Sequence, residues 1–269
     1  MDPQALHDLL VDDLAAGHTP MAIVATAGTT LTGAVDPLAA IADVAAEFAV
    51  WLHIDGAYGL PAAASQRAGH LFEGLRRADS ASVDAHKWLF VPKACSVLMT
   101  RHPEALRRAF AHDASYMVED PEFTATGGTY PVDETLEYSR PFRSLKLWTS
   151  LRAHGAGAFR LAIEENLRQA AMLYAEVLAH PRLEPLLGPP DLTVVPFRHL
   201  PETGDVNDHN IRLARAMQAD GRVYVTGAVI DGQACLRPCV VNFRTTDDDV
   251  RAIAQLAVEI GTQLQVSTS

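Results

Sequence analysis

The sequence predicts an α/β protein with a mostly parallel sheet, followed by a smaller α+β unit. Short apolar runs alternate with helical patterns through the first 110 residues, which is typical of parallel strands joined by helices. After residue 180 this alternation is lost, and strand-like runs with two helices indicate an α+β arrangement. We therefore divide the chain into residues 1–150, a connecting helix over 151–180, and a small α+β domain over 181–269.

The first part contains four short apolar runs that we predict as strands, at residues 21–27, 50–55, 80–83 and 95–100. Between the first two, Asp36 followed by Pro37 predicts a helix start, with Asp36 as its cap and Pro37 at its first position. A long stretch without periodicity, residues 111–141, is predicted to be a functional or mobile loop.

The second part begins with a helical pattern over residues 145–180, which we expect to break or kink near Gly155 and Gly157. Strands are predicted at 192–197, 222–230 and 234–243, and a helix over 207–220 that ends at Gly221. The last helix is predicted to start at Thr246, because Asp249 three residues later gives an arrangement close to a capping box.

Composition excludes several classes of function. The net charge is −11 and there is no basic block, so we predict no nucleic-acid surface. No apolar stretch is long enough to span a membrane, and the first residues lack the features of a signal peptide, so we predict a cytoplasmic protein. Three cysteines argue against a disulfide scaffold, and the absence of clustered Cys/His spacing means that no metal site is predicted.

Polar residues follow three of the predicted strands. Thr29 and Thr30 come after the first strand, Asp55 ends the second, and Lys87 lies just beyond the third. In open parallel sheets the ligand site forms at the carboxyl ends of the strands. We therefore expect these side chains to lie at one edge of the sheet.

Lys87 and Asp55 together indicate a pyridoxal 5'-phosphate (PLP) site. A buried ammonium is unfavourable, but a lysine held as a Schiff base carries much less cost and becomes reactive. PLP also needs an acid near its pyridine nitrogen to keep that nitrogen protonated, and Asp55 is placed for this role. The alternatives are a surface lysine after a turn and an aspartate that caps a loop or helix.

Five segments resemble the PLP-dependent decarboxylase family that includes the aromatic-amino-acid and glutamate decarboxylases. They are residues 25–30, 53–59, 86–88, 143–148 and 242–246. Their order and separation match the family through essentially the whole chain. The resemblance implies a fold-type-I PLP transferase-like fold, with residues 1–150 as the carboxy-terminal part of the PLP-binding large domain.

The resemblance also implies roles for individual residues. Lys87 would form the Schiff base, Asp55 would pair with the pyridine nitrogen, Ala57 would pack on the ring, Thr30 would lie near the phenolic oxygen, and His86 and Asp84 would lie near the phosphate. Aromatic-amino-acid decarboxylases usually have Asn where this chain has Asp84. An acid beside a phosphate is electrostatically unfavourable, so this position departs from the family.

Two further residues are identified only by the resemblance. Tyr116 matches a loop tyrosine that reaches the neighbouring subunit's site and is associated with protonating the carbanion; a phenylalanine there would indicate aldehyde-forming members. Arg237 matches an arginine that can hold the substrate carboxylate. The alternatives are an exposed loop aromatic for Tyr116 and a surface salt bridge for Arg237.

These expectations predict a homodimeric carboxy-lyase that converts an L-amino acid to the amine and carbon dioxide. An aromatic substrate is favoured over diaminobutyrate or glutamate. The resemblance starts partway through the large domain, so we expect the amino-terminal portion, which in relatives stacks on the cofactor and binds its phosphate, to be absent. Two alternatives stay open: a non-catalytic fragment that acts as a dimer partner, and an aldehyde-forming enzyme of the same family.

Overall fold

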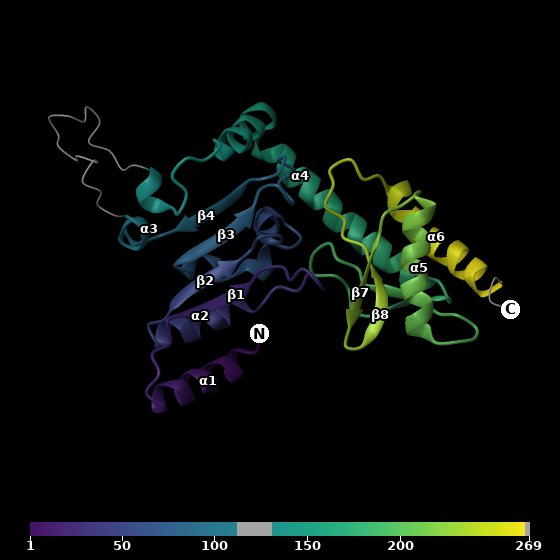
Figure 1. Ribbon diagram of the computed structural model, residues 1–269, viewed down its shortest axis with the longest axis horizontal. Coiled ribbons are helices and arrows are strands. Elements are labelled where there is room, and N and C mark those ends of the chain that lie inside the picture. The colour runs from purple at the N-terminus through teal and green to yellow at the C-terminus, as the bar shows by residue number, and fades with distance from the viewer. Residues whose placement is uncertain (112–130, 267–269) are drawn as a thin grey trace.

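The computed structural model describes residues 1–111 and 131–266. Two four-stranded sheets lie side by side and are linked by the long helix α4 (Figure 1). The first sheet is mostly parallel and the second is antiparallel, so the predicted combination of an α/β part with a small α+β part is confirmed.

The first sheet has the order β1-β2-β3-β4. Strands β1 (Ala22–Thr26), β2 (Trp51–Asp55) and β3 (Ser80–Asp84) are parallel, and β4 (Ser96–Thr100) runs antiparallel to β3. Parallel neighbours need crossover connections. These are α2 (Leu38–Glu47) after β1, and the 3₁₀ helices η1 (Leu60–Ala64), η2 (Gly69–Phe72) and η3 (Leu75–Arg77) after β2.

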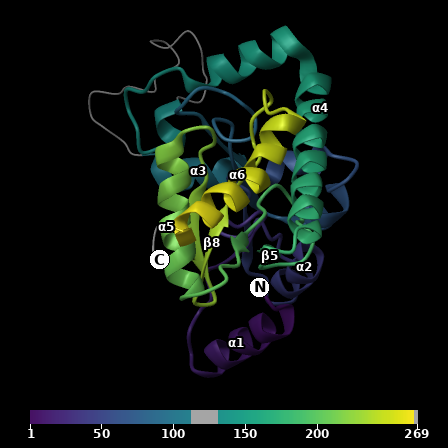
Figure 2. The same ribbon diagram turned by 90° about the vertical axis from the view of Figure 1, so that its right-hand side faces the viewer.

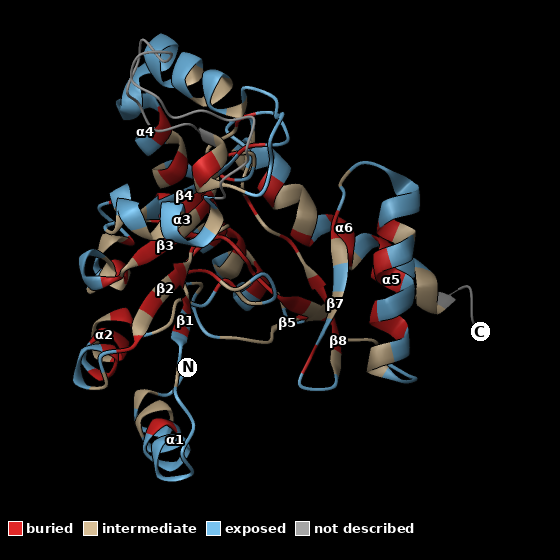
Figure 3. Ribbon diagram, turned by 60° about the vertical axis from the view of Figure 1, so that its left-hand side comes forward, coloured by how far each residue is buried: buried red, intermediate tan, exposed pale blue. Residues whose placement is uncertain are grey.

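The register brings the carboxyl ends of the parallel strands together. Thr26 pairs with Asp55, and Asp55 pairs with Ser82, two residues before the end of β3. The predicted convergence of strand ends on one edge of the sheet is therefore confirmed. Residues of the strands and of α2 form the core beneath this edge, with Ile54 and Ile41 fully buried (Figure 3). Each such side chain contributes roughly 1.5–3 kcal/mol through burial.

The start of α2 differs from the prediction. The helix begins at Leu38 behind Pro37, and no side chain caps it. The Asp36 carboxylate instead accepts a hydrogen bond from the Thr26 backbone N–H, at 2.7 Å, and pairs with the amino group of Met1. The prediction of Asp36 as a helix cap was wrong. The loop returns beside the end of β1, where the carboxylate accepts a hydrogen bond from the last backbone N–H of the strand instead.

The second sheet has the order β5-β6-β8-β7, with neighbouring strands antiparallel. Its strands are β5 (Leu183–Pro185), β6 (Phe197–His199), β7 (Thr226–Ile230) and β8 (Gln233–Arg237). They are shorter than predicted; of residues 192–197, only Phe197 lies in a named strand, and Val194 forms a single bridge to Cys239. Helices α5 (Val206–Asp220) and α6 (Asp247–Val266) pack against this unit (Figure 2). Gly221 ends α5 in the left-handed conformation, as predicted.

Helix α4 (Arg143–Ala179) connects the two cores. Its backbone leaves helical geometry at Gly155, with φ 74° and ψ 153°, which confirms the predicted break. The part before Gly155 has no buried residue. After the break, Ile163 and Leu167 pack in the core of the first sheet, whereas Leu173 and Val177 pack in the core of the second.

The remaining helices lie at the periphery. Helix α1 (Pro3–Ala15) packs against α2, and Asp2 caps it by accepting hydrogen bonds from two backbone N–H groups. Helix α3 (Pro103–Phe110) and the 3₁₀ helix η4 (Pro131–Glu134) flank residues 112–130. Among the described helices, none combines the length and apolar character needed to cross a membrane.

The predicted capping box of α6 is confirmed and gives a direct stability test. The Thr246 N–H donates to Asp249 Oδ2 at 2.8 Å, and the Asp249 N–H donates to the Thr246 hydroxyl at 3.3 Å. Thr246→Ala is expected to lower the free energy of unfolding by about 1 kcal/mol. Denaturant titration measures this change, and Thr246→Ser, which keeps the hydroxyl, should retain wild-type stability. Equal stability of Thr246→Ala and wild type would contradict the assignment.

Candidate active site

Three loops meet at the carboxyl edge of the first sheet. The Ala27 N–H donates to the Asp55 carbonyl at 2.8 Å, joining the ends of β1 and β2. The Asp84 N–H donates to the Ala57 carbonyl at 3.0 Å, joining the end of β3 to the loop after β2. Gly59 allows the loop after β2 to approach the end of β1 closely, because a Cβ at this position would lie 2.4 Å from the Ala27 carbonyl oxygen. The structure therefore brings the segments of Asp55, Ala57 and Asp84 together.

Asp55 ends β2 with one carboxylate oxygen engaged. Its Oδ1 accepts from the Ala57 N–H at 3.0 Å and from the Ser82 hydroxyl at 3.4 Å. Among the described residues, nothing donates a hydrogen bond to Asp55 Oδ2. The carboxylate is thus oriented by the backbone of the next loop and keeps one oxygen for a donor outside the described chain.

Lys87 lies on the turn that follows β3. Its N–H donates to the Asp84 carbonyl at 2.9 Å, and its Nζ lies 2.9 Å from Asp84 Oδ2. The side chain is 42% exposed, so the assumption of a buried lysine was wrong for the described residues. The reason is that the ammonium points to the open edge and pairs with a carboxylate of its own turn.

The first residue of β4 and the residue before it orient the groups beside Lys87. The Ser96 hydroxyl donates to Asp84 Oδ1 at 2.5 Å, and His86 Nδ1 lies 2.9 Å from the Cys95 carbonyl oxygen. His86 Nε2 is 3.9 Å from Asp84 Oδ2. Partial burial alone would raise the pKa of the Asp84 carboxyl, but hydrogen bonds from Ser96 and Lys87 outweigh it and lower this pKa below its ordinary value.

Sequence reasoning missed Ser96. It lies opposite Asp84 in the β3–β4 register. No local pattern around residue 96 reveals this neighbour, because the register of two antiparallel strands is a property of the folded sheet.

Arg237, in the second sheet, meets Thr30, in the loop that follows β1 of the first sheet. Arg237 Nη1 donates to the Thr30 carbonyl at 2.9 Å, and its Nη2 donates to the Thr226 hydroxyl at 3.2 Å. Among the described residues, no carboxylate forms an ion pair with Arg237, so the structure does not show the surface salt bridge that was the alternative. The guanidinium has further N–H groups that remain available for a carboxylate. Tyr116 lies outside the described residues.

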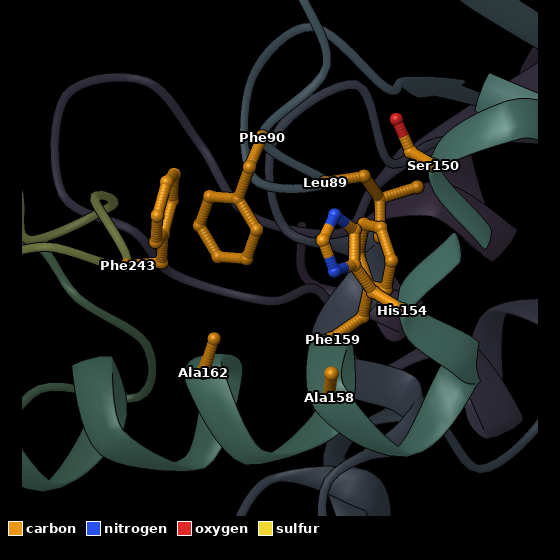
Figure 4. Close-up of a pocket in the computed structure, with 8 residues that line it drawn as sticks. All are labelled: Leu89, Phe90, Ser150, His154, Ala158, Phe159, Ala162 and Phe243. Carbon is orange, nitrogen blue, oxygen red and sulfur yellow. The ribbon is translucent and has the colours of Figure 1, made fainter. Parts of the chain in front are cut away.

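A mostly apolar hollow near the break in α4 is separate from the predicted site. It has a volume of about 250 Å³ and lies along α4 near the break at Gly155, as Figure 4 shows. Its lining residues are Leu89, Phe90, Ser150, His154, Ala158, Phe159, Ala162 and Phe243. Phe90 lies between Phe159 and Phe243, with ring-centre distances of 6.3 Å and 5.5 Å. None of the predicted site residues lines this cavity.

Comparison with known proteins identifies the family of this chain. The model of the pyridoxal-dependent decarboxylase conserved domain matches residues 1–200. Aromatic-L-amino-acid decarboxylase of Bacillus atrophaeus is 32% identical over 267 residues, covering 98% of this chain and 55% of that protein. Phenylacetaldehyde synthase of a Rosa hybrid cultivar is 34% identical over 264 residues, covering 92% of this chain and 50% of that protein.

Solved structures give the same result. The Oryza sativa protein TDC, crystallised with PLP and tryptamine, matches with a TM-score of 0.90 and 30% identity, covering 98% of this chain and 55% of that one. The chain thus spans about half the length of the relatives it matches. The domain match over most of the chain, together with these relatives, shows that the chain belongs to the pyridoxal-dependent decarboxylase family.

Proposed function

We propose that Lys87 binds PLP covalently and that this site serves the decarboxylation of an L-amino acid. The observation that carries the proposal is the junction of the Ala57 and Asp84 backbones, which places the Asp55 and Lys87 segments at one edge of the sheet. The available groups suit the cofactor: Lys87 supplies an amine for an aldehyde, and Asp55 has an oxygen available for a pyridine N–H.

Each residue has a defined task in this proposal. Asp55 would accept a hydrogen bond from the pyridine N–H at Oδ2, Ala57 would pack on the ring, and Thr30 would lie near the phenolic oxygen. When bound, PLP acts as an electron sink for the carbanion left by loss of carbon dioxide. Arg237 binds the substrate carboxylate through the N–H groups not used by Thr30 and Thr226, and so orients the bond to be broken.

We place His86, rather than Asp84, as the partner of the phosphate. The Asp84 carboxylate is held by Ser96 and Lys87, and its lowered pKa keeps it ionised. A phosphate next to it would experience like-charge repulsion. Asp84 is better suited to hold the Lys87 amine before the cofactor reacts. His86 is held at Nδ1 by the Cys95 carbonyl, and its Nε2 lies 3.9 Å from Asp84 Oδ2, so a phosphate bound at Nε2 would have to lie on the side away from that carboxylate.

An aromatic amino acid is the proposed substrate class. Several matched relatives are named aromatic-L-amino-acid, tryptophan or tyrosine decarboxylases. A second candidate is the aldehyde-forming reaction, because phenylacetaldehyde synthases of Rosa and Petunia match at 34% and 30% identity. We propose that Tyr116, as the proton donor to the carbanion, favours decarboxylation, and that it acts in the site of a second copy in a homodimer.

The products distinguish the two reactions. With PLP and phenylalanine, tyrosine or tryptophan, we expect carbon dioxide and the amine, without the aldehyde, ammonia and peroxide of the oxidative route. Glutamate and diaminobutyrate serve as competing substrates, and Tyr116→Phe should shift the products toward aldehyde. Formation of aldehyde and peroxide by the wild-type chain would assign it to the aldehyde-forming branch. A chain that turns over none of these amino acids would support the non-catalytic alternative.

A further inference from the structure

The residue after Lys87 is anchored by a buried polar network. Trp88 is fully buried, and its indole N–H donates to Asn166 Oδ1 at 3.0 Å. Asn166 lies on α4 after the break and is 1% exposed. Because an unpaired polar group in such a place is strongly unfavourable, this hydrogen bond constrains the position of the indole ring.

Asn166 also holds the segment that contains Phe243. Its amide nitrogen donates to the Asn242 carbonyl at 3.0 Å and to Gln169 Oε1 at 3.2 Å. Gln169, one turn further along α4, donates to the Thr245 carbonyl at 2.6 Å. The Asn166 amide therefore uses its oxygen and both its N–H groups in a site that excludes water.

The loop after Asp55 packs against the same buried indole ring of Trp88. The Tyr58 ring stacks on the Trp88 indole, with ring centres 5.4 Å apart and planes inclined by 18°. The Tyr58 hydroxyl bonds to the Thr193 hydroxyl and accepts the Thr193 N–H at 3.0 Å. Burial raises the pKa of Tyr58, so its hydroxyl stays neutral. The residues that directly follow Ala57 and Lys87 thus form one stacked pair, held at both ends by polar contacts.

We infer that Asn166 is a positioning residue for Lys87, acting through the Trp88 indole. It ties the turn that carries Lys87 to α4 and to the 242–245 segment, so that the amine stays at the carboxyl edge of the sheet. This inference rests on the proposed function of Lys87. It goes beyond that function because Asn166 lies 78 residues from Trp88 in the sequence and has no role in the proposed reaction.

Reductive labelling tests the inference. The chain has three lysines, so PLP followed by borohydride marks Lys87 with Lys93 and Lys146 as controls in the same molecule. Asn166→Leu keeps the side-chain size but removes all its hydrogen bonds. We expect the Lys87 label to fall about tenfold or more relative to the other two lysines. Gln169→Leu, which removes a neighbouring buried amide but leaves the Trp88 bond intact, should label Lys87 like the wild type.

A double-mutant cycle separates positioning from general destabilisation. Trp88→Phe keeps an aromatic ring against Tyr58 but removes the indole N–H. If Asn166 acts through this N–H, adding Asn166→Leu to Trp88→Phe should cause little further loss of the Lys87 label. Fully additive losses, or wild-type labelling in Asn166→Leu, would overturn the inference and leave the proposed function intact.

Hydrogen exchange gives a second measurement that needs no cofactor. Within residues 84–91, the N–H groups of Lys87, Phe90 and Val91 are hydrogen-bonded inside the turn. The His86 N–H is hydrogen-bonded to the Cys95 carbonyl. We expect about tenfold faster exchange of this peptide in Asn166→Leu than in Gln169→Leu, with β2 unchanged as the internal control. If Lys87 of the wild type takes no selective label, the proposed function fails, and the inference about Asn166 is then decided by hydrogen exchange alone. Equal exchange rates of this peptide in Asn166→Leu and Gln169→Leu would refute the inference.

Discussion

Lys87→Ala is expected to abolish the visible absorption band that the wild-type chain forms with PLP. Lys87 is the amine that the proposed site offers to the cofactor aldehyde, and alanine at this position has no amine to offer. The fold should tolerate the change, because the lost ion pair with Asp84 is half-exposed and such pairs contribute at most about 1 kcal/mol. Absorption spectroscopy with added PLP measures the effect.

Lys87→Arg is the matched control for charge. Arginine keeps a cation opposite Asp84 but cannot form the Schiff base, so this variant should also lack the band while retaining wild-type stability. Lys93→Ala and Lys146→Ala should both retain the band. A band that persists in Lys87→Ala, or that disappears in Lys93→Ala, would remove Lys87 from its proposed role.

Acidification is expected to destabilise the carboxy-terminal unit through a buried pair of histidines. His199 ends β6 and His209 lies on α5; they are 0% and 2% exposed, and His199 Nδ1 lies 2.9 Å from His209 Nε2. Their outer nitrogens, His199 Nε2 and His209 Nδ1, have no hydrogen-bond partner among the described residues. Helix α6 closes over the pair, since a Cβ on Gly261 would lie 2.8 Å from the His199 ring.

The shifts in pKa set the direction and the pH range of this effect. Burial, followed by the positive charges of His209, Arg182 and His180, lowers the pKa of His199 from 6.5 to about 4. Burial with Arg212 and Arg182 also lowers the pKa of His209. Between pH 6.5 and pH 4 the unfolded chain therefore binds protons that the folded chain does not, so stability falls as the pH falls.

We expect His199 alone to reduce the free energy of unfolding by about 2 kcal/mol between pH 7 and pH 5. Denaturant titrations at the two pH values measure this loss. A His199→Asn/His209→Asn variant should show a smaller loss, whatever its stability at pH 7. His18→Asn, which alters an exposed histidine, should keep the wild-type loss. Equal pH dependence in the wild type and the double variant would show that the pair does not control stability.

The fold was predictable where the chain signals its structure locally. Alternating periods predicted the four strands of the first sheet and the helix after the first of them, and Thr246 with Asp249 predicted the start of α6. The prediction at Asp36 failed because the end of the preceding strand, ten residues earlier, competed for the same carboxylate. The strands of the second sheet were overestimated because apolar runs also occur in extended segments that pair at only a single bridge.

In the candidate site, too, some features could be predicted from local sequence and others depend on the folded structure. Lys87 and Asp55 could be identified because each follows a predicted strand, and parallel strands share one carboxyl edge. The exposure of Lys87 could not be predicted, because burial depends on which segments cover the edge. Nor could the Ser96–Asp84 bond, which depends on the register of β4.

The sequence by itself thus determined which residues are the candidates for the chemistry and that they lie at or just beyond strand ends. Residue type and short-range periodicity suffice for both. Only the tertiary structure decided how these groups are held: Asn166 meets Trp88 across 78 residues, and Arg237 reaches the Thr30 carbonyl across 207. Such pairs arise when whole apolar faces of helices and sheets are buried against each other. That packing depends on the complete chain, and no single segment encodes it.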